Sequence, residues 1–592
     1  MVGLRGRGTN AGHDKSCSGV HVNVAQRLRA QSLKSSSQIA IATPTGKYRE
    51  GHFLAGHRRD YRTTTFQDLE NRSSSIAAGL QSIGVGPGKR IVLLVRFGED
   101  FITLVFALLK TGASVVLIDP GMGRSNLVKC LEASEPDGFV AIPIAQAIRA
   151  VLRHRFPNAR LNVTVGKTAG VLPTPTLSDL ERFSPNDYQP VQSDPLDPAA
   201  VIFTTGSTGP PKGVLYTHQT FNHQIDQLTS HYGISSGGID LSGFPLFGLF
   251  NAVMGTTTII PDMNPIRPAQ VDPPRLLDAI DQWQANQAFG SPALWTAVGR
   301  YCERAKRRVE SLKLVLSAGA PVPPRVMTWM RGAMNEEGTF HTPYGATEAL
   351  PVASIESRIV LNETATMNER GSGTCVGHHF SGIRWKVIAI DDGPLDSLDQ
   401  CQELSQGKIG ELIVSGPVVS TTYVTRTDQN ALHKVRDKEG NLWHRMGDVG
   451  YVDSQDRFWY CGRKSHRVMS ARSTLYTDPC ESIFNTHPSV YRSALVGIPS
   501  RNPNLKTPSI VVEPWPRTKP QRKSKQDEPA SQTNSLSSAA LKAELLALAG
   551  IHSTTVEITD VHIYPKSLPT DIRHNSKIFR EKLVPWVLRQ SR

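Results

Sequence analysis

The sequence predicts an α/β protein with a large N-terminal domain of α/β subdomains plus a β-rich subdomain, followed by a small mobile α+β C-terminal domain. Three observations support this fold class. From residue 63 onward, apolar segments of strand length alternate with segments of helical periodicity, which is typical of α/β folds. Short β-rich segments replace that alternation at about residues 371–460, and a smaller mixed unit follows Arg463. The chain of 592 residues is also too long for a single hydrophobic core.

The alternating region is divided into units by Gly-containing turns, of which residues 84–88 are the first. Each unit combines a stretch of helical periodicity with an apolar strand. We expect helices at 66–83, 98–110, 144–156 and 274–287, and strands at 90–95, 114–118, 200–204 and 311–317.

The β-rich subdomain and the C-terminal domain are predicted from shorter elements that lie between Gly, Pro and Asp turns. Residues 516–539 are rich in Pro, Ser, Lys and Gln, and such a composition cannot bury enough apolar surface to order itself, so we predict an insertion loop there. We expect strands at 385–390, 410–414, 457–460 and 493–497, and helices at 541–548 and 578–587.

The domain boundaries follow from these changes of pattern. Residues 1–20 are rich in Gly, Ser and Arg without periodicity, so we expect a flexible extension. The N-terminal domain then covers residues 21–463, and a C-terminal lid domain covers residues 464–592.

Charge and composition restrict the class of protein. The formal net charge of +14 is concentrated at the chain ends and in the expected loop, which is typical of solvated tails or a weak docking surface such as a peripheral membrane contact. No basic motif is interleaved with aromatic residues, so we expect no nucleic-acid partner. The seven cysteines lack metal-ligand spacing, which favours buried thiols in a reducing compartment. Residues 91–117 contain four charged side chains and cannot span a bilayer, and the N-terminus has no apolar signal core, so we expect a cytoplasmic protein.

A loop rich in Gly, Ser and Thr follows the strand expected at 200–204 and is the strongest local pattern. Its backbone N–H groups and hydroxyls can surround phosphate oxygens, and Lys212 adds positive charge. It is not a Walker sequence, because Pro211 and Gly213 flank that lysine. The predicted ATP phosphate-binding residues are Thr204, Thr205, Gly206, Ser207, Thr208, Gly209 and Lys212.

This loop resembles the phosphate-binding loop of the adenylate-forming superfamily, which includes acyl-CoA synthetases, luciferases and peptide-synthetase adenylation domains. Four further motifs follow in the order of that family, so the resemblance extends from about residue 40 to the end of the chain. It implies that the protein uses ATP and Mg²⁺. The four motifs are SAGAP at 317–321, TPYGATE at 342–348, WHRMGDVGY at 443–451 and PTDIRHNSK at 569–577.

The first two motifs are implied to bind the adenine and the phosphates. Tyr344 would stack on adenine next to Gly345, and Thr347 would contact the phosphates. Glu348 would hold Mg²⁺, which keeps most of its waters and needs only one or two carboxylates from the protein. The small residues implied to let adenine approach the backbone are Ser317, Ala318, Gly319 and Ala320.

The last two motifs are implied to bind the ribose and to catalyse adenylation. Asp448 would accept hydrogen bonds from the ribose hydroxyls, and Arg463 would be the second contact. Lys577 would be the catalytic lysine, which binds the attacking carboxylate and the α-phosphate as charge develops. The hinge between the domains would be at Ser465, where the family usually has Asp or Lys.

The step that follows adenylation is inferred from departures from the usual pattern. The histidine that commonly follows the aromatic residue of an acyl-CoA synthetase motif is Gly248 here, which argues against CoA as the acceptor. The motifs at 344–352, 458–468 and 571–575 resemble most closely the β-lactone synthetases of bacterial long-chain olefin biosynthesis. This resemblance implies that a long-chain β-hydroxy acid is adenylated and that its own hydroxyl then displaces AMP.

Two other classes of function remain alternatives. A long-chain acyl-CoA synthetase would transfer the same adenylate to CoA, and a non-catalytic scaffold would only bind ATP and a fatty acid. The base that activates the β-hydroxyl is unassigned, with His466 a candidate because it flanks the hinge. The resemblance also leaves open other olefin-pathway enzymes as partners in a multi-enzyme assembly.

Overall fold

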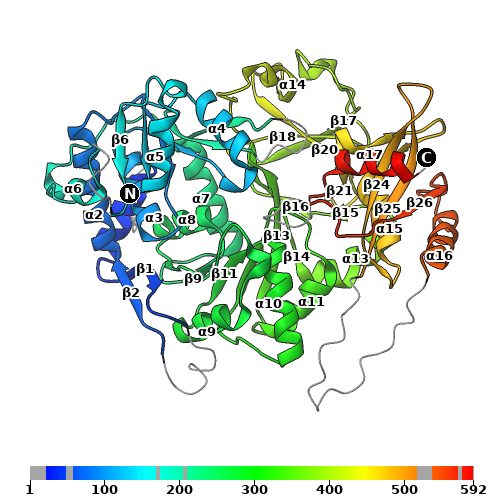
Figure 1. The fold of residues 1–592 in the computed structure, drawn as a ribbon, viewed down its shortest axis with the longest axis horizontal. Coiled ribbons are helices and arrows are strands. Elements are labelled where there is room, and N and C mark those ends of the chain that lie inside the picture. Colours follow the sequence, from blue (N-terminus) through cyan, green and yellow to red (C-terminus); the bar gives the residue numbers. More distant parts are fainter. Residues whose placement is uncertain are drawn as a thin grey trace, which may run out of the picture.

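The computed structural model describes residues 22–48, 58–167, 174–204, 210–515, 537–570 and 577–590. The extension expected at 1–20 and residues 516–536 of the expected insertion loop lie outside these ranges. Figure 1 shows the first two-thirds of the chain as two large sheets with helices between and around them, and the last third beside them. The described part of that last third contains three further sheets, of six, two and three strands.

The first large sheet has six strands in the order β6-β5-β3-β4-β7-β8. The pairs from β6 to β7 are parallel, and β8 closes the edge by antiparallel pairing with β7. Its strands are β3 (Arg90–Leu94), β4 (Ser114–Leu117), β5 (Gly138–Ala141), β6 (Leu161–Thr164), β7 (Pro198–Phe203) and β8 (Gly213–Thr217). The helices of this part are α2 (Phe66–Ser82), α3 (Glu99–Lys110), α4 (Arg124–Ala133), α5 (Pro143–Val151) and α6 (Leu177–Leu180).

The second large sheet has nine strands in the order β16-β14-β13-β12-β11-β9-β10-β1-β2, with a parallel centre and antiparallel edges. Its strands are β1 (Ile39–Pro44), β2 (Tyr61–Thr65), β9 (Ile239–Ser242), β10 (Thr257–Ile259), β11 (Gln287–Gly290), β12 (Leu314–Ser317), β13 (Thr339–Ala346), β14 (Ala349–Glu356) and β16 (His378–His379). Its longer helices are α1 (Ala25–Lys34), α7 (His218–Tyr232), α8 (Pro245–Met254), α9 (Pro273–Trp283), α10 (Pro292–Ala305) and α11 (Pro324–Ala333).

The main core lies between the two large sheets. Helix α7 contacts β8 of the first sheet and β14 of the second, so it is packed between them. Its apolar residues Phe221, Ile225 and Leu228 belong to one buried cluster that also includes Ile41 of β1 and Leu93 of β3. Because this cluster joins both sheets, burial of its apolar surface holds their facing edges in a fixed relation.

A separate antiparallel sheet follows in the order β15-β21-β20-β18-β17, with β19 on the side of β20. The strands are β15 (Thr374–Cys375), β17 (Arg384–Ile388), β18 (Gly410–Ser415), β19 (Lys434–Arg436), β20 (Leu442–Val452) and β21 (Phe458–Arg463), and the short helix α14 (Asn430–His433) precedes β19.

The C-terminal part is built on a three-stranded sheet in the order β24-β25-β26. Successive residues of β24 point to opposite faces, so Ala494 and Val496 pack against α17, while Leu495 packs against α15 and α16. The elements are α15 (Thr477–Asn485), β24 (Val490–Pro499), β25 (Lys506–Pro514), α16 (Ser538–Ile551), β26 (Asp560–Ile563) and α17 (Arg580–Gln590). No described helix combines the length and the apolar character needed to cross a membrane.

The fold class is confirmed, and most expected elements are found within a few residues of their expected ends. The helix expected at 274–287 is too long, because Gln284 adopts a left-handed conformation (φ 52°) that ends α9, and Gln287 already begins the buried strand β11. The helix expected at 144–156 ends at Val151 and continues as a 3-10 turn. Helix α16 begins at Ser538, so the expected loop is shorter at its C-terminal end.

Candidate active site

The predicted site residues lie where strands of the two large sheets end. Thr204 follows β7, Ser317 is the last residue of β12, and Tyr344 lies near the end of β13. Ligands of open α/β sheets usually bind beyond the carboxyl ends of parallel strands. The Thr204 N–H donates to Lys212 O (3.0 Å), and Lys212 N–H donates to Thr204 Oγ1 (3.2 Å). The other predicted loop residues, Thr205, Gly206, Ser207, Thr208 and Gly209, lie outside the described residues.

Tyr344 and Arg463, both half-buried, form a polar group with the buried Asp448. The Tyr344 hydroxyl donates to Asp448 Oδ2 (2.5 Å), and Arg463 Nη1 lies 2.9 Å from Asp448 Oδ1. Burial raises the pKa of the Asp448 carboxyl, and the Arg463 charge opposes that shift. The contact with Arg463 is an ion pair whose angles do not meet those of a hydrogen bond. Among the described residues, Asp448 Oδ1 therefore receives no hydrogen bond. This oxygen can still accept hydrogen bonds, as the role of binding the ribose hydroxyls that the sequence assigns to Asp448 requires.

Thr347 and Glu348 form the turn between β13 and β14 and are held by two tyrosines from other elements. The Tyr216 hydroxyl of β8 donates to Thr347 O (2.6 Å), and the Tyr423 hydroxyl donates to Glu348 Oε1 (2.7 Å). The Glu348 side chain is buried, and in the part of the chain that the structure describes no lysine or arginine pairs with it directly. A buried carboxylate without a paired cation is a suitable ligand for a Mg²⁺ ion held mainly by phosphates and water.

The segment that follows β12 is shaped for close approach of a flat group. Gly319 has φ +99°, a conformation that favours glycine, and a Cβ at Gly345 would lie 2.6 Å from Ala349 O. Ser317 Oγ is buried without a hydrogen-bond partner among the described residues. Residues Ala318 and Ala320 complete this segment, whose small side chains fit the adenine role that the sequence assigns.

The expected hinge and the expected catalytic lysine lie at one end of the site. Ser465 is exposed within a 3-10 turn, while its neighbour Lys464 is fixed by Glu411 Oε2 (3.0 Å). Burial is the main cause that lowers the pKa of His466 to about 3, and the positive charges of Arg580, Arg463 and Lys577 add to it. Lys577 is therefore close enough to act on this imidazole, and His466 is neutral and a weak base in this arrangement.

Three residues around Lys212 were not predicted from the sequence: Tyr423, His433 and Lys434. Lys212 Nζ lies 3.1 Å from His433 Nε2 and 4.7 Å from the centre of the Tyr423 ring, and Lys434 Nζ lies 5.6 Å from the same ring centre. No motif marks these residues, because they lie more than two hundred positions after Lys212 and approach it only in the folded chain.

A small apolar hollow lies between the start of α1 and the helices α3, α7 and α8. The ring of Phe221 on this hollow lies 5.1 Å from that of Tyr216, the residue that contacts Thr347. No polar side chain lines the hollow, and its volume of about 30 Å³ has room for little more than a methyl group. Its lining residues are Val24, Val105, Phe106, Leu109, Phe221, Ile225, Leu249, Phe250 and Val253.

Gly248, which replaces the family's usual histidine, is packed against Phe97. A Cβ at Gly248 would lie 3.1 Å from the Phe97 ring and 3.4 Å from Thr258 Cγ2. Phe97 therefore fills the space on this side of α8, and a histidine would displace it.

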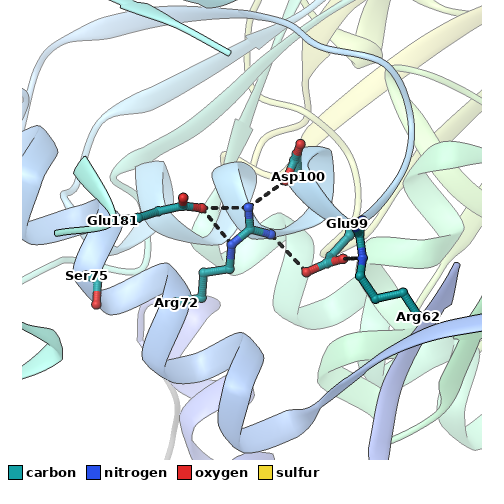
Figure 2. Close-up of a pocket in the computed structure, with 6 residues that line it drawn as sticks. All are labelled: Arg62, Arg72, Ser75, Glu99, Asp100 and Glu181. Carbon is teal, nitrogen blue, oxygen red and sulfur yellow. Dashed lines mark hydrogen bonds and ion pairs between the residues drawn. The ribbon is translucent and has the colours of Figure 1, made fainter. Parts of the chain in front are cut away.

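A more open hollow, lined by a different set of residues, contains an ion-pair network (Figure 2). Arg72 of α2 pairs with Glu99 (3.0 Å), Asp100 (2.6 Å) and Glu181 (2.6 Å), and Arg62 pairs with Glu99 (3.0 Å). Each carboxylate already has an arginine partner, so the network ties α2, α3 and the segment after α6 together and is not the catalytic site.

Comparison with known proteins agrees with this geometry. Residues 24–424 match a family described as "AMP-binding enzyme", and the chain belongs to that family. Two relatives are olefin beta-lactone synthetases. The one from Stenotrophomonas maltophilia is 42% identical over 95% of this chain and 98% of its own length, and the one from Xanthomonas campestris pv. campestris is 40% identical over 96% and 98%.

Among solved structures, the amide bond synthetase McbA from Marinactinospora thermotolerans has the same fold. Its TM-score is 0.73 at 19% identity, over 95% of this chain and 99% of that one. The similarity at this identity concerns the fold alone, whereas the two olefin beta-lactone synthetases are similar in sequence along nearly the whole chain.

Proposed function

We propose that this protein is an ATP-dependent, AMP-forming ligase that converts a long-chain β-hydroxy fatty acid into a β-lactone. The observation that carries the proposal is the 40–42% identity to two olefin beta-lactone synthetases over at least 95% of the chain. The grouping of Tyr344, Asp448, Arg463 and Glu348 supports the adenylation half of the reaction.

The first half-reaction forms an acyl-adenylate. A carboxylate oxygen of the acid attacks the α-phosphorus of ATP, the bond to the β-phosphate oxygen breaks, and pyrophosphate leaves. Lys577 binds the oxygens on which charge develops, and Asp448 with Arg463 holds the ribose. Glu348 would hold Mg²⁺, whose charge neutralises the phosphate oxygens.

The second half-reaction closes a four-membered ring within the same substrate. The β-hydroxyl oxygen attacks the acyl carbonyl carbon, the bond to AMP breaks, and the hydroxyl proton is released. Because hydroxyl and carbonyl belong to one bound molecule, their effective concentration is high and no second substrate site is needed. The strained ring forms because AMP is a far better leaving group than the oxygen of a free carboxylate.

The length and location of the substrate are also part of the proposal. The similarity to the two olefin beta-lactone synthetases supports a long-chain acid, whereas the apolar hollow next to Phe221 and Phe250, at about 30 Å³, is too small in this structure to hold an alkyl chain. The exposed side chains of Ile144, Ile148 and Val151 lie about one turn apart on α5, which supports a peripheral contact with a membrane from the cytoplasmic side. Other enzymes of olefin biosynthesis are the proposed protein partners.

The decisive experiment omits CoA. Purified protein with ATP, Mg²⁺ and a long-chain β-hydroxy acid should yield AMP and an organic product lighter than the acid by one water. A product that appears only with CoA, and that has the mass of a thioester, would contradict the lactone. Binding of ATP and acid without turnover would instead indicate a scaffold.

A further inference from the structure

A short segment after the β-rich strand β18 lies against the phosphate side of the site. It consists of α14 and β19, and β19 pairs with β20, the strand that carries Asp448. The segment places two side chains, His433 and Lys434, beside Lys212 and Tyr423. None of the five sequence motifs includes it.

Lys434 is a half-buried lysine whose hydrogen-bond partners are neutral. Its Nζ donates to Ser420 O (2.5 Å) and to Ser420 Oγ (3.1 Å). An ammonium has three donors, so one remains, and no described carboxylate lies within ion-pair distance of it. Burial lowers the pKa of Lys434 to about 7. Burying a cation without a counter-ion is costly, so such a group usually has an anionic ligand.

His433 holds Lys212 in place. Lys212 Nζ can only donate, so His433 Nε2 accepts at 3.1 Å, and this leaves the Nδ1–H to point towards Arg445 O (3.4 Å). Burial, together with the Lys212 charge, lowers the pKa of His433 to about 4, so the imidazole is neutral. It orients the Lys212 ammonium without adding a charge.

The two lysines lie near one aromatic ring and act electrostatically on one carboxylate. Both amino groups lie within reach of the Tyr423 ring, and Ser420, which binds Lys434, also donates its N–H to the main-chain O of Glu348 (2.8 Å). The charges of Lys212, Lys434 and Glu348 act on one another without a direct ion pair. Two lysines near one carboxylate favour an anionic ligand, and more strongly so when a metal ion neutralises Glu348.

We propose that Lys434 is a second phosphate-binding lysine, which together with Lys212 binds the β- and γ-phosphates of ATP and the departing pyrophosphate. His433 acts as a positioning residue for Lys212. The inference rests on the proposed function, since it deepens the same ATP site. The alternative is that Lys434 only secures the backbone at Ser420.

The test compares ATP, AMP and inorganic pyrophosphate as ligands, because AMP lacks the two phosphates in question. Binding is measured by calorimetry with Mg²⁺ and without any acyl substrate, on the wild type, Lys434→Met and Lys434→Arg. A hydrogen bond to a charged group predicts that Lys434→Met weakens ATP and pyrophosphate about tenfold to a hundredfold and leaves AMP unchanged. Lys434→Arg should restore most of the affinity, because it keeps the charge.

The matched control is Lys438→Met, since Lys438 lies four positions away and is 78% exposed. It should bind all three ligands like the wild type. His433→Leu should weaken ATP but not AMP, by a smaller factor than Lys434→Met. Unfolding temperatures show whether each variant is folded.

The outcomes separate the two proposals. Equal losses for ATP and AMP in Lys434→Met, or unchanged ATP binding, would overturn the role of Lys434. A wild type that binds no ATP would overturn the proposed function itself, and the inference with it. Selective loss for ATP and pyrophosphate, rescued by arginine, supports the inference.

Discussion

Replacing Tyr423 by phenylalanine tests how the buried carboxylate of Glu348 is prepared for its role. The change removes one hydroxyl, which donates to Glu348 Oε1 at 2.7 Å, and keeps the ring that both lysines face. Tyr423 is 1% exposed, so water does not readily replace the lost donor. We expect a folded protein with a poorly oriented Glu348.

The size of the effect follows from the type of bond. A hydrogen bond to an ionised group contributes about 1.5–3 kcal/mol, so kcat/KM for adenylation should fall about tenfold to 150-fold. Pyrophosphate exchange into ATP, driven by a long-chain β-hydroxy acid, measures this step without the lactone step. The KM for the acid should change less than kcat, because the lost hydroxyl contacts Glu348, the expected Mg²⁺ ligand.

Tyr451→Phe is the matched control. The Tyr451 hydroxyl also donates a hydrogen bond, to Ser372 O (3.1 Å), but away from the site. Exchange activity in Tyr423→Phe within twofold of that in Tyr451→Phe would refute the idea that this hydroxyl orients Glu348.

Three other changes test different parts of the molecule. Lys577→Ala should reduce pyrophosphate release about a hundredfold or more while AMP still binds; unchanged release would refute its catalytic assignment. Val253→Phe should overpack the small apolar hollow and lower the free energy of unfolding by about 1–3 kcal/mol; an unchanged stability in denaturant would show that the hollow has room for the ring. Asp240 is fully buried and has its pKa raised from 3.8 to about 7 by burial. The native state therefore keeps a proton that the unfolded state has lost, so stability should fall as pH rises from about 4 to 7, by about 1.4 kcal/mol per pH unit and about 4 kcal/mol in all. Denaturant unfolding across this range should show a flatter profile for Asp240→Asn, and an unchanged slope would contradict the assignment.

Elements with a regular apolar pattern were predicted well from the sequence. Helix α2 was expected at 66–83 and spans Phe66–Ser82, where Thr65 and Asp68 form a capping box. Helix α9 was predicted too long, because the left-handed conformation of Gln284 is imposed by the packing of the strand that follows. Local periodicity does not report such a tertiary constraint.

The roles of the motif residues stay predictions, but the structure shows which of them meet. Tyr344, Asp448 and Arg463 come from two different sheets and form one hydrogen-bonded and ion-paired group. The candidate base, His466, lies near Lys577 and has a lowered pKa, so the base for the β-hydroxyl stays unassigned, as it was from the sequence.

The sequence by itself determined the α/β class, the motifs that resemble those of adenylate-forming enzymes, and the candidate site residues. These features depend on short stretches of chain, in which glycines, hydroxyl residues and single charged residues stand at fixed spacings. Only the tertiary structure decided that Tyr423, His433 and Lys434 lie around Lys212 and Glu348 and that Phe97 packs against Gly248. The physical reason is that these contacts join residues far apart in the chain, and burial removes the water that would otherwise screen their charges.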